Sequence, residues 1–271
     1  MKKPFLLILF ACALAASCTR RAETTEDLIL ATVSDSLEVV PEALSPDEGV
    51  CASAAVCLEI PQKGLRGKSL RNIRRSIVSE ALGKEYARLS VADAIAAGLS
   101  AYSESYQQDA REIAGSEEGN HLLHTLNYSR KVSGEVVSLC GGILAYRILV
   151  SDYSGGAHGT ETEKWLNFKA GDGSLLRPET LFTESGRETL DYLLKTELQA
   201  GGHTFWNYGS EENPWLDKNF RLDADSVRFL YNPYEVDCYA AGQVHVALPV
   251  EKVLPLIDEK KLKLNLENSC E

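Results

Sequence analysis

The chain is short of basic residues and has no hydrophobic run long enough to cross a membrane. Its 271 residues include 28 lysines and arginines against 39 aspartates and glutamates, a formal net charge of −11. Phosphate binding needs the opposite sign, so this balance argues against a nucleic-acid-binding protein. The longest apolar stretch, residues 5–16, is too short to span the ~30 Å hydrocarbon core of a bilayer as a permanent helix.

Motifs of catalysis and of metal binding are also missing. The G-x-S-x-G nucleophile elbow is absent, as is a phosphate-binding glycine loop with its lysine. No two cysteines have the C-x-x-C spacing of a zinc site. His121 and His124 would point to opposite faces of the strand expected there, which argues against a shared metal. The sequence therefore predicts no catalytic residue, no metal site and no cofactor.

The N-terminus carries the features of a secretory signal. Two lysines precede the apolar run, and three small residues at 15–17 stand directly before Cys18. This arrangement resembles a bacterial lipobox, which implies removal of a lipoprotein signal peptide, residues 1–17, and diacylglyceryl attachment at Cys18. The alternative is an ordinary secretory signal followed by a chance cysteine. With the lipid, the protein is expected to be exported and anchored to the cell envelope, at the outer membrane facing the periplasm in a Gram-negative cell.

Composition divides the mature chain into three parts. Residues 18–48 are rich in Thr, Ser, Glu and Asp with two prolines, and are predicted to be a flexible tether, so that folding begins near Val50. Residues 49–118 are the expected N-terminal helical subdomain and residues 119–271 the α+β domain. Five cysteines follow Cys18, so at least one thiol is free or pairs between molecules. Cys51 and Cys57 lie too far apart in one extended strand to bond.

Hydrophobic periodicity predicts two helices first and mostly strands later. Leu70, Ile73 and Ile77 recur at helical spacing in a helix over 68–83, and Ser90 is the expected N-cap of a second helix over 90–114. Strands are expected at 50–60, 121–129, 132–139, 142–152, 160–168, 220–222, 226–231, 243–248 and 262–266, a hairpin turn at 170–173, and helices at 184–198 and 249–257. The block order indicates an α+β fold in which the N-terminal helical pair packs on a mostly antiparallel sheet, with a further helix near 184–198.

A glycine-rich loop, residues 152–159, lies between two of the predicted strands. Its glycines allow close approach of another chain or a ligand. Candidate binding residues are Tyr153, Gly155, Gly156 and His158 of this loop and Tyr234 of a later Tyr-Asn-Pro-Tyr turn. The alternative is that these residues only shape the crossover between strands and close the core. Further aromatic candidates stand in the irregular segment 201–219: Trp206, Tyr208 and Trp215.

Several short motifs follow one another in a characteristic order. They are Leu126-Asn127-Tyr128, Gly142-Ile143-Leu144-Ala145-Tyr146, Tyr153-Ser154-Gly155-Gly156-Ala157-His158-Gly159, Tyr231-Asn232-Pro233-Tyr234-Glu235 and Tyr239-Ala240-Ala241-Gly242. Together, over about residues 50–258, they resemble the extracytoplasmic domain of RsiV-type anti-sigma factors and PdaC-type peptidoglycan deacetylases. In the anti-sigma factors this domain binds and senses lysozyme; in the deacetylases it accompanies a separate catalytic domain. This sequence shows neither a sigma-factor-binding segment nor a deacetylase domain.

The resemblance and the missing motifs together indicate a binding protein rather than an enzyme. We expect a lipid-anchored envelope protein whose non-catalytic domain binds a lysozyme-like protein or a peptidoglycan glycan, with the lipid bilayer as its other partner through Cys18. Two alternatives stay open: a hydrolase of envelope polymers, and a structural scaffold lipoprotein. Converging, exposed Tyr153, His158 and Tyr234 favour binding, whereas a buried carboxylate beside a histidine in a cleft favours the enzyme.

Overall fold

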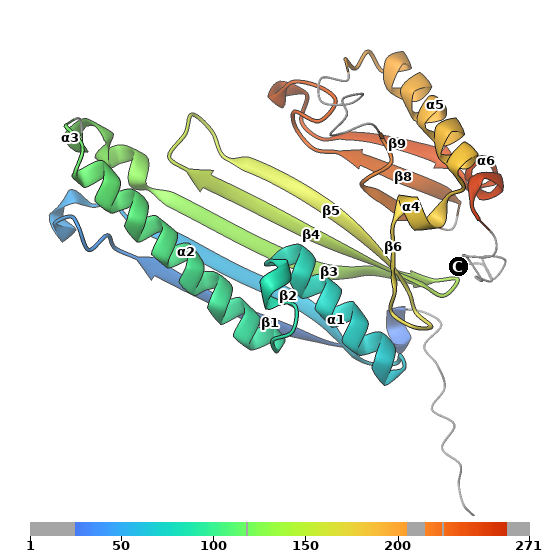
Figure 1. Ribbon diagram of the computed structural model, residues 1–271, viewed down its shortest axis with the longest axis horizontal. Coiled ribbons are helices and arrows are strands. Elements are labelled where there is room, and N and C mark those ends of the chain that lie inside the picture. The colour runs from blue at the N-terminus through green and yellow to red at the C-terminus, as the bar shows by residue number, and fades with distance from the viewer. Residues whose placement is uncertain (1–24, 118, 205–214, 224, 259–271) are drawn as a thin grey trace, which may run out of the picture.

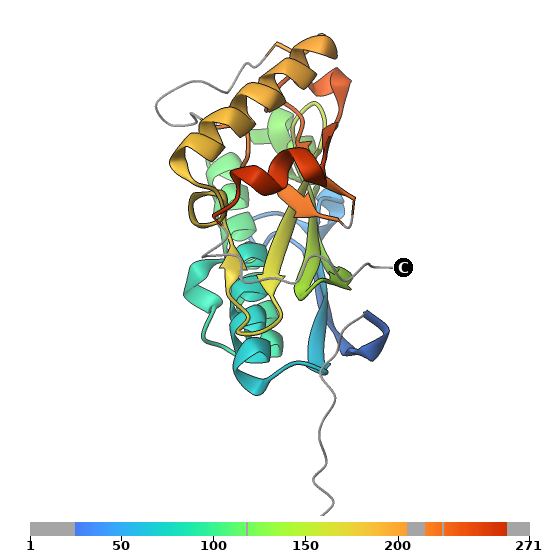
Figure 2. The same ribbon diagram turned by 90° about the vertical axis from the view of Figure 1, so that its right-hand side faces the viewer.

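The computed structural model describes residues 25–117, 119–204, 215–223 and 225–258. It confirms the α+β class: a six-stranded sheet carries helices on one face, and a smaller three-stranded sheet with its own helices stands beside it (Figure 1). Figure 2 shows the two parts one above the other, with the smaller sheet and its helices at the top. Within the described residues, no helix is both long and apolar enough to cross a bilayer.

The large sheet has its strands in sequence order. They are β1 (Ile29–Val39), β2 (Ala52–Lys63), β3 (Tyr128–Cys140), β4 (Ile143–Ser154), β5 (Thr160–Lys169) and β6 (Leu175–Leu176). All neighbours are antiparallel except β2 and β3, which are parallel. A parallel pair needs a long crossover, and the two helices between β2 and β3 supply it.

Helices α1 (Gly67–Ala81) and α2 (Val91–Ala114) cover one face of this sheet (Figure 1). Strand β2 alternates strictly, so that Val56, Leu58 and Ile60 face the helices and are buried with Ile73 and Ile77 of α1. Side chains on one strand point alternately to opposite faces, so the intervening residues of β2 lie on the face without helices. We call this second face the open face of the sheet.

The smaller part contains the hydrophobic core of the C-terminal half. Its elements are α4 (Pro178–Leu181), α5 (Glu184–Ala200), β7 (Phe220–Leu222), β8 (Ser226–Tyr231), β9 (Val244–Pro249) and α6 (Val250–Val253). Leucines spaced three or four residues apart on α5 (Leu190, Leu194 and Leu198) are fully buried against the three strands. This part is closed by Ile257, which forms an isolated bridge with Phe182.

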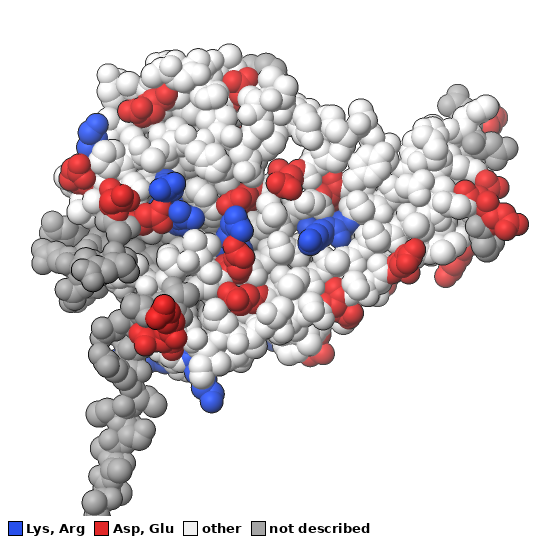
Figure 3. Space-filling view, turned by 180° about the vertical axis from the view of Figure 1, so that it is seen from behind, with Lys and Arg blue, Asp and Glu red and all other residues white. Residues whose placement is uncertain are grey.

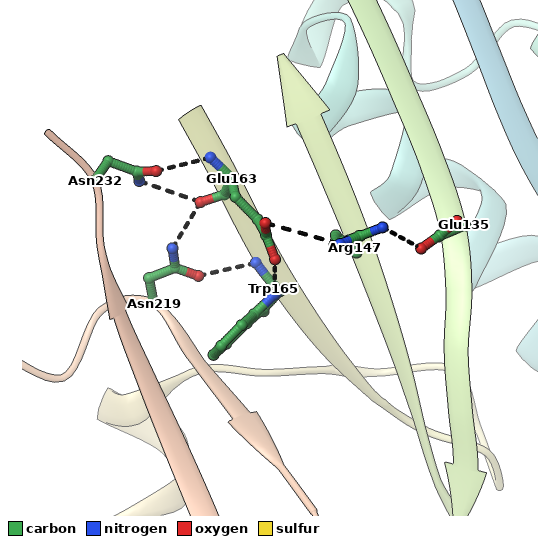
Figure 4. Close-up of polar contacts among 6 residues, drawn as sticks. All are labelled: Glu135, Arg147, Glu163, Trp165, Asn219 and Asn232. Carbon is green, nitrogen blue, oxygen red and sulfur yellow. Dashed lines mark hydrogen bonds and ion pairs between the residues drawn. The ribbon is translucent and has the colours of Figure 1, made fainter. Parts of the chain in front are cut away.

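Two asparagine side chains join the two parts along the outer edge of β5 (Figure 4). Asn219 accepts a hydrogen bond from the Trp165 amide at 2.8 Å and donates one to the Glu163 carbonyl at 2.7 Å. Asn232 accepts one from the Glu163 amide at 2.7 Å and also donates to the Glu163 carbonyl, at 3.1 Å. The two amide groups thus replace the backbone of a missing neighbour strand and satisfy an edge that would otherwise be unpaired.

Most predicted elements are confirmed to within a few residues. The helices at 68–83, 90–114 and 184–198 form, and Ser90 accepts a hydrogen bond from the Asp93 amide as the N-cap of α2. The hairpin at 170–173 joins β5 to β6, with Gly173 at φ +72°. The region expected to be one short helix at 249–257 contains α6 followed by a 3-10 turn, Leu254–Leu256. The strand expected at 262–266 lies outside the described residues.

The predicted tether and domain boundary are wrong. Residues Ile29–Val39 form β1, which pairs with β2 along its whole length, so the fold begins about 20 residues before Val50. The segment looked like a linker because one side of β1 lies on the open face, where Ser and Thr suffice. The boundary at 118/119 also fails as a division of the fold, because β2 and β3 lie on either side of it and belong to one sheet.

The strand expected at 121–129 is also wrong. Its first part folds as α3 (Gly119–Leu122) and a 3-10 helix η4 (Leu123–Leu126), and β3 starts only at Tyr128. Leu126 is buried against α2 residues such as Ala110, which favours a helical turn over an extended chain. The argument against a metal at His121 and His124 therefore loses its basis in strand geometry. Both histidines are exposed, and the described residues contain no group of three potential metal ligands.

The cysteines are in two states. Cys140, at the end of β3, is disulfide-bonded, whereas Cys51, Cys57 and Cys238 are free. Cys51 and Cys57 thus do not bond to each other, as their spacing in one strand predicted. Cys18 and Cys270 lie outside the described residues.

Candidate binding surface

The glycine-rich loop between β4 and β5 is held against the turn before β3. Gly155 has φ +81°, and a Cβ there would lie 1.9 Å from the carbonyl oxygen of Thr125. Any side chain would collide with that backbone, so Gly155 is required for packing. Gly156 differs, because the nearest atom to a Cβ at that position is 3.9 Å away. The loop is therefore anchored at one glycine and leaves the residues after it exposed.

The loop and the Tyr-Asn-Pro-Tyr turn meet in an exposed aromatic cluster of His158, Tyr234 and Tyr239. The His158 ring stacks on Tyr239 with centroids 3.9 Å apart and an interplanar angle of 19°. Tyr234 lies 5.7 Å from Tyr239, centroid to centroid, and its hydroxyl is 3.3 Å from Nε2 of His158. Tyr234 is 42% exposed and Tyr239 37% exposed. Large rings left this open to solvent, yet packed on one another, are typical of a contact surface for a ligand.

Hydrogen bonds define the tautomer of His158. Its Nδ1 lies 3.1 Å from the Gly159 carbonyl oxygen, which can only accept, so Nδ1 carries the proton. Nε2 then accepts from the Tyr234 hydroxyl, and the Tyr239 hydroxyl donates to the same Gly159 carbonyl at 3.0 Å. The imidazole is thereby held in one orientation by both tyrosines.

The Tyr-Asn-Pro-Tyr-Glu turn presents Tyr234 in a strained conformation. Tyr234 has φ +70°, the single positive value among non-glycine residues in the described chain. Around it, Tyr231 is buried and donates to the Leu216 carbonyl, while Glu235 accepts from the Asn232 amide at 2.6 Å. Burial raises the pKa of Glu235, with the hydrogen bonds from Asn232 acting in the opposite direction. The turn residues are thus internal supports, and Tyr234 is the member exposed to solvent.

Tyr153 belongs to the open face rather than to the aromatic cluster. Strand register pairs it with Ser129 of β3, and beyond Ser129 lie Ser53 of β2 and Glu38 of β1. This row borders a hollow of about 460 Å³ in the open face. The hollow is lined by Ser36, Leu37, Glu38, Ser53, Ala54, Ala55, Ser129, Arg130, Lys131 and Ser151. No interaction brings Tyr153 into contact with His158.

A second, smaller hollow of about 200 Å³ lies further along the same face. Arg147 crosses it, with one guanidinium nitrogen 2.5 Å from a Glu135 carboxylate oxygen and another 3.9 Å from Glu163 (Figure 4). Glu163 also accepts a hydrogen bond from the Trp165 indole. Arg147 is thus shared by two carboxylates, and the third, Glu59, accepts a hydrogen bond from the Val136 amide, so the hollow is acidic overall. The free Cys57 is exposed in it.

A histidine–carboxylate pair that sequence reasoning missed lies in the C-terminal part. His203 Nδ1 is 2.9 Å from an Asp237 oxygen, and both side chains are 22% exposed. The hydrogen bond from His203, followed by that from the Cys238 amide, holds the pKa of Asp237 below its usual value. The free thiol of Cys238 also hydrogen-bonds the Asp237 carboxylate, so a nucleophilic side chain lies beside the pair. Within the described residues, no hydrogen bond joins that thiol to His203.

The aromatic residues of segment 201–219 are only partly described. Trp215 lies under the Arg187 guanidinium, 4.7 Å from its ring centroid, and Arg187 forms a bidentate ion pair with the buried Asp217. Trp215 is therefore part of an internal contact. Trp206 and Tyr208 lie outside the described residues.

Residues 179–251 match the family model described as Protein of unknown function (DUF3298). The match spans about a quarter of the chain, from α4 to α6. It contains Tyr234 and Tyr239, whereas His158 reaches the cluster from outside it, on the β4–β5 loop. No curated protein matches the chain.

Two solved structures of DUF3298-family proteins share the fold of this chain. A DUF3298-family member from Bacteroides fragilis is 21% identical, with a TM-score of 0.72, and the match covers 85% of this chain and 94% of that one. A DUF3298-family protein from Pseudomonas aeruginosa is 14% identical, with a TM-score of 0.55, and covers 87% and 97% respectively. At these identities the likeness concerns the fold alone. Because most of the chain aligns, the shared architecture extends beyond the DUF3298 region to the large sheet.

Proposed function

We propose that this protein is an exported, lipid-anchored envelope protein whose domain binds peptidoglycan glycan strands without catalysis. The observation that carries the proposal is the aromatic cluster of His158, Tyr234 and Tyr239. Aromatic rings stack on the apolar faces of sugar rings, and hydroxyl and imidazole edges beside them supply hydrogen bonds. Backbone strain at Tyr234 supports the same reading, since strained conformations concentrate at ligand contacts.

The anchoring part of the proposal rests on the signal features and on Cys18. Since the described fold begins with a 3-10 turn at Thr25–Asp27 and the buried Leu28, six residues separate it from Cys18. Such a segment reaches at most about 25 Å when fully extended. The domain would then stay close to the bilayer, where it meets the nearest layer of the cell wall.

A second candidate ligand is a lysozyme-like protein. The resemblance to RsiV-type domains favours it, and the net charge of −11 suits a cationic partner. The same cluster would then act as an aromatic anchor in a protein interface. The hydrolase alternative would need the free Cys238 beside the His203–Asp237 pair as its nucleophile, and in the described residues no hydrogen bond joins that thiol to His203.

Retention assays separate these candidates. The purified full chain is incubated with insoluble peptidoglycan, and separately with immobilised lysozyme, and the bound fraction is measured. Retention by peptidoglycan, abolished by Tyr239→Ala, is the expected result. Retention by lysozyme alone would replace the glycan with the protein ligand. Retention by neither would refute the binding function and leave the scaffold alternative.

A further inference from the structure

The larger hollow of the open face is formed by two neighbouring rows of side chains across four strands. One row runs Ser36, Ala55, Lys131, Ser151 from β1 to β4, and the other runs Glu38, Ser53, Ser129, Tyr153. Adjacent strands are about 4.8 Å apart, so each row spans about 14 Å. Three of the four middle positions, Ala55, Ser53 and Ser129, carry small side chains, which leaves a space of about 460 Å³ beside Lys131. A space of this size admits a sugar unit.

The polar groups of this hollow lack protein partners. Within the described chain, the hydroxyls of Ser36, Ser53 and Ser129 form no hydrogen bond, in contrast to Ser151, which donates to Glu161 at 3.3 Å. Three hydroxyls on three adjacent strands therefore face solvent with their hydrogen-bonding capacity unused.

Lys131 is the cation of the hollow that is left for a ligand. Its neighbour Arg130 is neutralised by an ion pair with Asp152, whereas Lys131 has no ion pair or hydrogen bond among the described side chains. Glu38 stands at the other end of the rows and can accept a hydrogen bond. Figure 3 shows the molecule from behind, where red acidic patches outnumber the blue basic ones. Lys131 supplies a local positive charge for an anionic ligand, against the overall net charge of −11.

We propose that this hollow is a sugar subsite that takes a carboxylate-bearing saccharide unit. Lys131 pairs with the carboxylate, while Ser36, Ser53 and Ser129 exchange hydrogen bonds with the ring hydroxyls. Tyr153 closes the row nearest the glycine-rich loop, so the subsite and the aromatic cluster lie toward the same end of β4. The choice of a saccharide rests on the proposed function, whereas the preference for a carboxylate rests on Lys131.

N-acetylmuramic acid and N-acetylglucosamine form a matched pair of probes, since they differ by one lactyl group with its carboxylate. Binding of each to the purified full chain is measured by saturation-transfer NMR titration at low salt. We expect N-acetylmuramic acid to bind about three- to tenfold more tightly, because an exposed charge-assisted contact has that strength. The advantage should shrink as salt is added. Equal affinity for the two sugars would overturn the subsite.

Variants test whether tighter binding of N-acetylmuramic acid arises in this hollow. Lys131→Gln should remove the preference, Lys131→Arg should keep it, and Lys252→Gln, the same charge change on α6, should leave it unchanged. Ser53→Ala should weaken both sugars. A preference that survives Lys131→Gln contradicts the proposal. If the preference is absent but peptidoglycan is still retained, only the subsite fails; if it is present while peptidoglycan is not retained, the proposed function fails and the subsite stands.

Discussion

The adjacent glycines 155 and 156 differ in whether their position can accept a side chain. Gly155→Ala should destabilise the fold by about 2 kcal/mol or more, because it combines a positive φ with a collision against the Thr125 backbone. Gly156→Ala has room and should change stability by less than about 0.5 kcal/mol. Urea unfolding of both variants measures the difference. Similar values for the two would mean that the loop does not pack on Thr125 in solution.

The exposed tyrosines of the aromatic cluster can be removed without touching the core. Tyr234→Gly suits the positive φ, so we expect normal stability but loss of most peptidoglycan retention, and Tyr239→Ala should act alike. Tyr192 on α5 is 70% exposed and is far from the cluster in sequence and element, which makes Tyr192→Ala the matched control. An equal loss of retention in Tyr192→Ala would show that the assay measures non-specific adsorption through exposed aromatic side chains.

Sequence reasoning reached part of this cluster. It proposed His158 and Tyr234 from a glycine loop and an Asn-Pro turn, and the structure brings them together although they lie 76 residues apart. Tyr239, which makes the closest ring contact, was quoted only within a motif. No local pattern reveals which distant loop a ring will stack on, since that depends on how the two sheets are joined. Whether Tyr153 binds a ligand stays a prediction.

At the scale of elements, the two sheets are joined by the side-chain amides of Asn219 and Asn232. These amides hydrogen-bond the edge of β5 as the backbone of a neighbouring strand would. Asn219→Asp replaces the donor facing the Glu163 carbonyl by a second acceptor, so it should cost about 2 kcal/mol of unfolding free energy. Asn72→Asp alters the same kind of bond, to the Asp172 carbonyl, at an exposed position, and should cost less than about 1 kcal/mol. Thermal or urea unfolding of the two variants measures these costs. Equal losses of unfolding free energy would contradict the role of Asn219 at the β5 edge.

The sequence predicted well those helices and strands that have one buried and one solvated side. Their apolar residues recur at the spacing expected for a helix or a strand. Strand β1 was missed because its outward residues, such as Ser34 and Ser36, lie on a face that nothing covers in the described chain. Its inward residues Val33 and Leu37 are only partly buried at the sheet edge, so the hydrophobic signal is weak. The alternating pattern in 121–129 wrongly predicted a strand. There the buried residue, Leu126, belongs to a helical turn and not to an extended chain.

At the scale of the whole molecule, Glu80 on α1 links the helices to strand β5 of the large sheet and to the segment that leads into α4. Its carboxylate pairs with Lys164 of β5 and, at 2.8 Å, with Arg177 before α4. Burial raises the pKa of Glu80, but the hydrogen bonds and charges of Lys164 and Arg177 outweigh it, so the pKa is lowered overall. A lowered folded-state pKa stabilises the fold above the unfolded value of about 4.3, and the gain disappears as pH falls through the folded value.

Glu80→Gln should therefore lower the free energy of unfolding by about 1 kcal/mol at pH 7, a value reduced by the exposure of both cationic partners. The difference from wild type should vanish as pH falls below the lowered folded-state pKa of Glu80. Urea unfolding from neutral pH down through that pKa provides the measurement. Glu251→Gln, at an exposed residue of α6, is the control and should show no such pH dependence. A difference that persists at low pH would assign the loss to packing instead.

The position of the whole domain relative to the membrane follows from Cys18 if that residue carries the lipid. Cys18→Ser should release the protein into the soluble fraction of the envelope while leaving its urea unfolding curve unchanged, because β1 starts eleven residues later. Unchanged fractionation would refute the anchor. A variant with about 20 added Gly and Ser residues after Cys18 tests the consequence of a short tether, since the coil would gain roughly 15 Å of typical reach. Such a variant should stay with the membrane and bind purified peptidoglycan as wild type does, yet crosslink in cells to glycan strands farther from the bilayer. Identical crosslinking by both lengths would mean that the tether does not limit which strands the domain can reach.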